Sequence, residues 1–358
     1  MNGIASWLAA QPECEVMLAM DRSPEDFSIG NIERVLLKKA DRRLAREGLA
    51  ERMAAFMQKA EKTHYSLRSL SSRKGEPDVV MTYSSDGGAF GLKELFPNAF
   101  IVNYVVSMEP FSRHEARAVG LLQAMQCADS DMNFAFGEAA RKRLPRPFWR
   151  RTGLAPLAVD TGWFAPLAES GKTDGDKKLL VFWLKDCDPG GFGFWLNGIT
   201  RFLLAREEMA ALVLAPNTGV VRLAEQRLAA LPASLADRLT LKCYPARNWR
   251  RDMWRRASLF VSPFRSLNLD MLEAMSCGCP PVTACRARGL QAGFNCLGFS
   301  GKNLFAAIEG FLANPEELAG AGLAAREYAL SCHAVERVVP GHIREVLAAR
   351  DNWLGSRA

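Results

Sequence analysis

The residues with the most specific chemistry lie in the segment Arg265–Val282, which reads RSLNLDMLEAMSCGCPPV. The apolar run Leu259–Phe264 before it is expected to be a strand that leads into a helix over about 268–277. Glu273 falls in the first turns of that helix. There a carboxylate can accept two ligand hydroxyls at once, and unpaired helix amides can bind phosphate. The alternative interpretation is that Glu273 only complements the helix dipole.

A second segment with binding chemistry is the loop over 84–88, which contains Ser85 and Gly87. It follows an expected strand, Asp78–Tyr83, and precedes a helical pattern. Backbone amides in such a loop could bind a phosphate or a ligand hydroxyl, so we treat it as a candidate site. An ordinary exposed turn is an equally good interpretation.

Cysteines cluster near the candidate helix and raise the question of a metal site. Their spacings match no paired two-residue ligand pattern, and no histidine lies among them. Small buried core thiols are the favoured interpretation, and we expect no metal ion. The cluster consists of Cys277, Cys279, Cys285 and Cys296.

The net charge of +7 is concentrated in two stretches that also carry tryptophan, Arg141–Arg151 and Arg247–Arg256. Basic residues beside tryptophan suit an anionic membrane surface or a phosphorylated ligand, and they also suit solvated helix faces. No nucleic-acid motif accompanies them, so no nucleic acid is expected. No apolar run approaches the ~20 residues of a membrane span. We therefore expect a cytoplasmic protein, peripheral to the inner face of the membrane at most.

The elements that must position these residues alternate between short apolar runs and amphipathic stretches, which predicts an α/β fold with parallel sheets. The second half carries helical patterns at about 192–208, 220–231, 248–256 and 268–277. Its expected strands are Lys178–Lys185, Ala211–Pro216, Arg238–Tyr244, Leu259–Phe264 and Pro281–Ala284.

The first half repeats the pattern less regularly, with a long helical region over roughly 30–73 and a helix over Asn2–Gln11 that contains Gly3. A doubly wound sheet normally opens with a strand and a glycine-rich turn, so the first strand of this half is expected to be missing. The expected strands are Glu15–Met20, Asp78–Tyr83, Ala99–Val105, Met132–Phe136 and Leu154–Val159.

Several of these motifs together resemble the family 4 glycosyltransferases. Leu272, Glu273, Ala274, Met275, Cys277 and Gly278 match the family's L-E-A-M-A-C-G helix, and Gly293-Phe294-Asn295 sits at its D-G-x-N-G turn. Val159-Asp160-Thr161 with Phe164 and Pro166 looks like G-V-D-T-x-x-F-x-P. Leu95-Phe96-Pro97 through Tyr104 and Glu109 resembles the F-P…Y-x-E run of one subgroup.

The resemblance implies the GT-B architecture: two Rossmann-like doubly wound domains facing a cleft. We place the first, acceptor-side domain at 1–167 and the second, nucleotide-sugar-binding domain at 178–332. The polar stretch Ala168–Lys178 is the linker candidate, and a C-terminal helix at about 333–350 is expected to pack back onto the first domain.

The resemblance also implies which residues bind the donor, with Glu273 accepting hydrogen bonds from its ribose hydroxyls. Lys185 stands where the family holds the diphosphate with arginine, and the family's second basic residue falls at Gly190 or Gly191. Arg265 replaces a glutamate that usually addresses the sugar. Asn268 either contacts the sugar or caps the helix, and the cap is favoured. The donor-binding candidates are Glu273, Lys185, Asn268, Ser266, Leu269 and Tyr244.

On the acceptor side the catalytic group is unknown. The family often has a histidine near the reacting carbon, and His114, on the loop after Ala99–Val105, is the candidate together with Glu109. Gly3, Ser85 and Gly87 are candidates for contacts with phosphate or acceptor.

The resemblance thus implies a retaining, hexosyltransferase-like enzyme that uses a nucleotide diphosphate sugar and no metal. The expected acceptor is a glycan or lipid-linked glycan of surface polysaccharide synthesis. Two alternatives remain: a GT-B protein that binds nucleotide or glycan without turnover, and a nucleotide-sugar epimerase.

Overall fold

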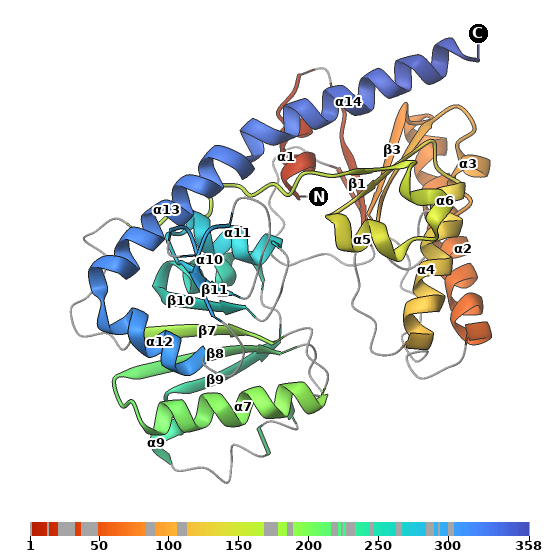
Figure 1. The fold of residues 1–358 in the computed structure, drawn as a ribbon. Helices are drawn as coiled ribbons and strands as arrows, with labels where there is room; N and C mark the ends of the chain where they lie inside the picture. The colour runs from red at the N-terminus through yellow and green to blue at the C-terminus, as the bar shows by residue number, and fades with distance from the viewer. Residues whose placement is uncertain are drawn as a thin grey trace. The chain divides into compact units, whose positions relative to one another are not determined.

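The structure is a computed structural model in which the chain divides into two compact units (Figure 1). Unit 1 comprises Met1–Leu157 together with Val338–Ala358, and unit 2 comprises Ala158–Arg337. The residues that the structure describes are 2–12, 14–20, 33–36, 49–83, 90–105, 113–167, 178–184, 189–215, 221–222, 225–226, 233–243, 246–262, 267–283, 290–292, 294–299 and 304–357. No helix among them is both long enough and apolar enough to cross a membrane.

Unit 2 is built on a six-stranded parallel sheet in the order β12-β11-β10-β7-β8-β9. Because the order runs outward from β7 on both sides, the sheet is doubly wound, as the sequence predicts. Its strands are β7 (Lys178–Trp183), β8 (Met209–Ala215), β9 (Leu239–Cys243), β10 (Ala257–Ser262), β11 (Pro281–Thr283) and β12 (Leu297–Gly298).

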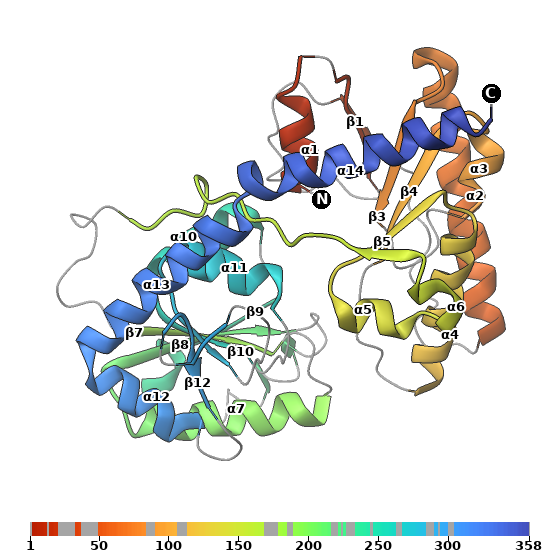
Figure 2. The same ribbon diagram turned by 45° about the horizontal axis from the view of Figure 1, so that its top comes forward.

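Helices cover both faces of this sheet (Figures 1 and 2). Leu180 and Phe182 of β7 pack in the cluster that contains the apolar residues of α7, while Trp183 turns to the other face and meets the Phe260 ring at 6.1 Å. Strands that are buried on both faces are continuously apolar, so these strands could be predicted from the sequence. The helices are α7 (Pro189–Leu204), α9 (Ala233–Ala236), α10 (Arg247–Arg256), α11 (Leu269–Ser276), α12 (Leu304–Ala313) and α13 (Pro315–His333).

Unit 1 contains a four-stranded parallel sheet, β3-β4-β5-β6, and a separate parallel pair, β1-β2. The four-stranded sheet comprises β3 (Val79–Tyr83), β4 (Phe100–Val105), β5 (Met132–Ala135) and β6 (Thr152–Leu154). The pair comprises β1 (Met17–Met20) and β2 (Glu33–Leu36).

One helix prediction and one strand prediction for the first half of the chain were wrong. The region 30–73 was predicted to be helical, but Glu33–Leu36 pairs with β1, because strand pairing overrides a local charge pattern. The strand predicted over Leu154–Val159 instead ends at Leu154. Val159 forms an isolated bridge with Ala334, so its backbone bonds are made away from β5.

Helices also lie on both faces of the four-stranded sheet, as two neighbouring residues of β4 show. Asn103 turns toward α4, where its amide meets the Cys127 sulfur, while the Tyr104 hydroxyl meets His342 of α14. Successive strand residues point to opposite faces, so α4 and α14 cover opposite faces. The helices are α1 (Asn2–Ala9), α2 (Leu49–Lys74), α3 (Leu92–Leu95), α4 (Arg113–Ala128), α5 (Glu138–Arg143), α6 (Arg146–Trp149) and α14 (Val335–Gly355).

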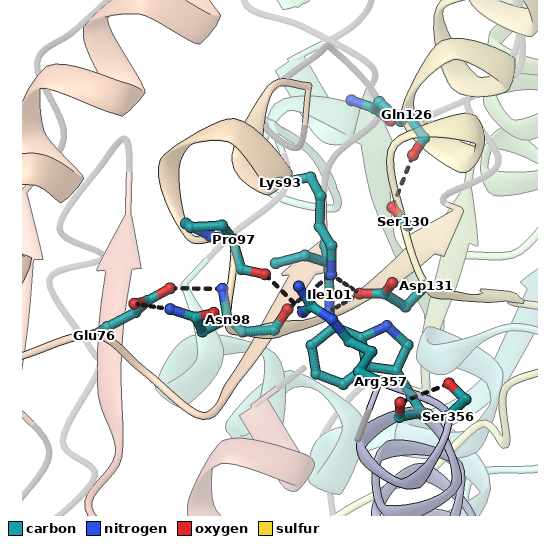
Figure 3. Close-up of polar contacts among 12 residues, drawn as sticks. Glu76, Lys93, Pro97, Asn98, Ile101, Gln126, Ser130, Asp131, Ser356 and Arg357 are labelled. Atoms are coloured by element: carbon teal, nitrogen blue, oxygen red, sulfur yellow. Dashed lines mark hydrogen bonds and ion pairs between the residues drawn. The ribbon is translucent and has the colours of Figure 1, made fainter.

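The end of α14 is fixed to unit 1 at the edge of the sheet where β4 begins (Figure 3). Lys93 donates to Asp131 and lies 4.3 Å from the ring centre of Trp353, and Arg357 covers the same ring at 4.7 Å. Arg357 also donates to the Pro97 carbonyl at 3.0 Å. Ligands in open α/β sheets bind at the opposite, carboxyl edge. These contacts are therefore structural.

Candidate functional site

The candidate helix α11 follows the carboxyl end of β10 and starts with a side-chain cap. The Asn268 side chain accepts a hydrogen bond from the Met271 amide at 2.9 Å, and its backbone is extended. Asp270 adds an acidic residue in the first turn, which complements the helix dipole. Asn268 is therefore occupied as a helix cap, the interpretation that the sequence favoured.

The second half of the motif ends the helix and packs it. Gly278 has φ of 76°, a conformation that favours glycine, and the Cys279 amide turns back to the Ala274 carbonyl at 2.9 Å. A Cβ on Gly322 of α13 would lie 2.6 Å from the Gly278 carbonyl oxygen, so α13 packs directly against this turn. The residues Ala274 to Gly278 thus end the helix that carries Glu273 and pack it against α13.

Glu273 itself is buried, with 2% of its surface exposed, and its carboxylate is paired. Arg250 of α10 donates from Nε to Oε2 at 2.9 Å and from Nη2 to Oε1 at 2.8 Å. The Trp254 indole donates to Oε2 at 3.3 Å. The sequence indicated neither partner, because both precede Glu273 by about twenty residues. The predicted ribose contact of Glu273 stays a prediction, now for a carboxylate with a fixed orientation.

Other arginines of α10 lie against the segment 160–165 of the same unit. Arg247 forms an ion pair with Asp160 at 2.8 Å, and its guanidinium lies 5.2 Å from the Trp163 ring centre. Arg251 covers the same ring at 4.5 Å, and Arg255 donates to the Ala165 carbonyl at 2.6 Å. Residues four apart share one helix face, so this face of α10 serves internal packing.

The remaining candidates are distributed as follows. Leu269 is the first residue of α11 and is 39% exposed, and Gly3 lies in α1. His114 was predicted on a loop, but it lies in the first turn of α4 because that helix begins at Arg113. Gly191 lies in the first turn of α7. The candidates that fall outside the described residues are Lys185, Tyr244, Ser266, Ser85, Gly87 and Glu109.

No group of three or more metal-binding side chains occurs among the residues that the structure describes. Cys277, Cys279 and Cys296 are buried, while Cys285 lies outside the described residues. Burial raises the pKa of the Cys277 thiol to about 12, which keeps it protonated at neutral pH. These thiols behave as small core side chains.

The sequence missed Arg250 and Trp254, although a weak signal was present. They are four residues apart on α10, on the same face as the apolar Met253, which is also buried. An arginine on the apolar face of a basic helix indicates a buried partner for its charge. The sequence does not indicate which acidic residue is this partner; only the fold brings Glu273 to Arg250.

Comparison with known proteins gives a family match for part of the chain. Residues 13–131 match the family model described as Glycosyl transferase family 4 group. The matched residues all lie within unit 1. No curated protein matches the sequence.

Solved structures show the fold of the whole chain. Sucrose-phosphate synthase from Thermosynechococcus elongatus has a TM-score of 0.69 at 16% identity, covering 97% of this chain and 92% of the other. HepE of Anabaena in complex with UDP-glucose gives 0.66 at 14% identity, with 97% and 94% covered. A putative UDP-N-acetylglucosamine 2-epimerase from Listeria monocytogenes gives 0.59 at 15%, with 99% and 93% covered. The fold is the GT-B fold, as predicted.

Proposed function

We propose that this protein is a retaining, hexosyltransferase-like glycosyltransferase that moves a sugar from a nucleotide diphosphate donor to a glycan or lipid-linked acceptor. The observation that carries the proposal is the position of α11 and Glu273 after the carboxyl end of β10 in a parallel, doubly wound sheet. Ligands of such sheets bind at that edge. The glycosyltransferase-family match of residues 13–131 supports the class of enzyme.

The donor would bind unit 2 through its ribose and its diphosphate. Each carboxylate oxygen has two lone pairs, and Oε1 of Glu273 accepts from Arg250 alone among the hydrogen bonds of the described residues. The 2′-hydroxyl of the ribose could therefore bind Oε1 without displacing Arg250. The amides of Leu269 and Asp270, which precede the capped Met271 amide, would face the diphosphate. The other proposed donor contacts are Lys185, Ser266, Leu269 and Tyr244. Amides and basic side chains would neutralise the leaving diphosphate without a metal ion.

The acceptor is proposed to be a surface polysaccharide or its lipid-linked precursor, reached from an anionic membrane surface. We assign the membrane contact to Arg141–Arg151 and not to Arg247–Arg256. Lys142, Arg146, Arg150 and Arg151 are exposed, whereas four of the five arginines of α10 contact partners within unit 2, namely Arg247, Arg250, Arg251 and Arg255.

Sedimentation with vesicles of anionic lipid tests the membrane contact. Replacing Arg146, Arg150 and Arg151 by Gln should weaken binding, by up to about 1 kcal/mol for each charge. Replacing Arg68, Arg73 and Lys74 of α2, which are exposed as well, removes the same charge elsewhere. An equal loss of vesicle binding in both variants would mean that binding depends only on the net charge of the protein. That result would contradict the assignment to Arg141–Arg151.

The enzymatic proposal is tested with the full chain and a panel of nucleotide diphosphate sugars, starting with UDP-glucose, which a structural neighbour binds. Release of nucleoside diphosphate with transfer of the sugar to a glycan or lipid-linked acceptor would support a transferase. Retention at the anomeric carbon is read from the product by NMR. No release from any donor would contradict the proposal.

Two alternatives have an observation in their favour. The Listeria neighbour described as a putative 2-epimerase has the same fold, so an isomerised sugar formed without acceptor would indicate an epimerase. The glycine at position 191, in the first turn of α7 where the family has a second basic residue at 190 or 191, favours binding without turnover, which would appear as nucleotide affinity with no release of product.

A further inference from the structure

The pair between Arg250 and Glu273 is more than a buried contact, because it fixes the direction of one carboxylate. The terminal torsion of a glutamate is broad, so a free carboxylate samples many orientations. A bidentate guanidinium fork fixes the carboxylate plane, and here both of its bonds are shorter than 3 Å. Trp254 is fully buried and packs edge-on against Phe260 at 4.7 Å, so its indole donor is fixed as well.

We propose that Arg250 is a positioning residue of the donor site, which holds the Glu273 carboxylate with Oε1 directed to the donor ribose. The inference rests on the proposed function, because it assigns Glu273 to the ribose. Arg250 does not touch the ligand in this account. It acts only through Glu273.

A second buried arginine of unit 2 shows what a purely structural role looks like. Arg238 is 6% exposed, close to the 9% of Arg250. Its guanidinium donates to the backbone carbonyls of Ser234, Leu203 and Arg206, each at 2.8 Å. It therefore ties chain segments together and orients no side chain. Arg238 is the matched control for Arg250.

Arg250→Lys separates positioning from charge. Lysine keeps the positive charge but replaces the planar fork by a single ammonium, so the carboxylate plane is no longer fixed. Arg238→Lys makes the same change at the control position. Circular dichroism and thermal unfolding of each variant confirm that unit 2 is folded.

The test is calorimetric titration of the full chain with UDP and with 2′-deoxy-UDP. A hydrogen bond to a charged group corresponds to roughly a tenfold or greater preference for the ribonucleotide in the wild type. We expect Arg250→Lys to lose most of that preference while its affinity for 2′-deoxy-UDP stays within about twofold. Arg238→Lys should keep the preference. The change in preference between wild type and Arg250→Lys measures the coupling between Arg250 and the 2′-hydroxyl of the ligand.

The outcomes distinguish the ribose contact of Glu273 from the positioning role of Arg250. Equal affinity of the wild type for both ligands would contradict the ribose contact in the proposed function. A wild-type preference that Arg250→Lys retains would overturn the positioning role alone. Equal weakening for both ligands in Arg250→Lys would make the role structural and also overturn it.

If Arg250→Lys does not fold, Trp254→Phe provides the second variant. It removes the indole donor to Oε2 and leaves the guanidinium fork, so the ribose preference should persist. Complete loss of the preference in Trp254→Phe would assign the positioning to the indole and overturn the role of Arg250.

Discussion

Both units bury a polar pair, but the two pairs differ in charge. In unit 1 the Tyr104 hydroxyl and Nε2 of His342 lie 2.7 Å apart, while in unit 2 Arg250 forms a bidentate ion pair with Glu273. Burial raises the pKa of Tyr104 and lowers the pKa of His342, so both groups stay neutral. The first pair joins β4 to α14, and the second joins α10 to α11.

The difference indicates what each pair contributes. A neutral buried hydrogen bond stabilises the fold by about 1 kcal/mol. A buried ion pair loses hydration that its own attraction roughly restores, so apolar residues of similar size would often stabilise a fold as well. A contribution to stability is thus a poor explanation for the ion pair in unit 2. Its effect on the orientation of the Glu273 carboxylate is a better one.

The largest expected effect comes from removing the acid of the ion pair. Glu273→Ala leaves Arg250 buried without its carboxylate, which should lower the free energy of unfolding of unit 2 by about 3–5 kcal/mol. Urea titration measures it. The control is Glu309→Ala, which removes an exposed partner of Arg206 at 3.0 Å and should cost less than about 1 kcal/mol.

Replacing both members sharpens this prediction. The double variant Arg250→Met with Glu273→Met should be more stable than either single variant, because no unpaired charge remains. If Glu273→Ala cost no more than Glu309→Ala, or if the double variant were the least stable, the comparison between the pairs would be wrong.

The neutral pair should give a smaller effect. Tyr104→Phe removes the hydroxyl and leaves the His342 nitrogen without this partner, which should cost about 1–2 kcal/mol in unit 1. Thermal or urea unfolding, followed by a probe in unit 1, measures it. A loss as large as that of Glu273→Ala would mean that charge does not distinguish the pairs.

The smallest effect is a dependence on pH. His342 faces Tyr104 and Glu345; burial lowers its pKa, and Glu345 opposes this in part. Because the folded pKa lies below the unfolded one, the contribution is present above the unfolded value near ~6.5 and is lost as pH falls through the folded pKa. His342→Asn should remove that acid-side slope of stability. An unchanged slope would contradict this assignment.

The elements of unit 2 were largely predictable, because strands buried on both faces are continuously apolar and α11 has a cap and a C-terminal glycine. The predicted helix at 268–277 agrees with Leu269–Ser276, and the strand at 178–185 agrees with Lys178–Trp183. Unit 1 was harder to predict. The short strand Glu33–Leu36 is defined by its pairing with β1, which no local pattern shows.

The candidate site was predictable only in part. The motif identified the helix and Glu273, but the partner of the carboxylate is 23 residues earlier, on another helix. Spacing reveals contacts within one helix and not between two. The basic stretch Arg247–Arg256 was open to a membrane interpretation because Asp160 and Trp163, which meet its arginines, are distant in the sequence.

Binding of the donor ribose by Glu273 can be measured by calorimetric titration of the Glu273→Gln variant with UDP. Glutamine keeps the shape of the side chain but removes its charge. Affinity should fall by roughly tenfold to a hundredfold relative to the wild type, provided that thermal unfolding shows the variant to be folded at the titration temperature. A folded Glu273→Gln variant that binds UDP as tightly as the wild type would contradict the account.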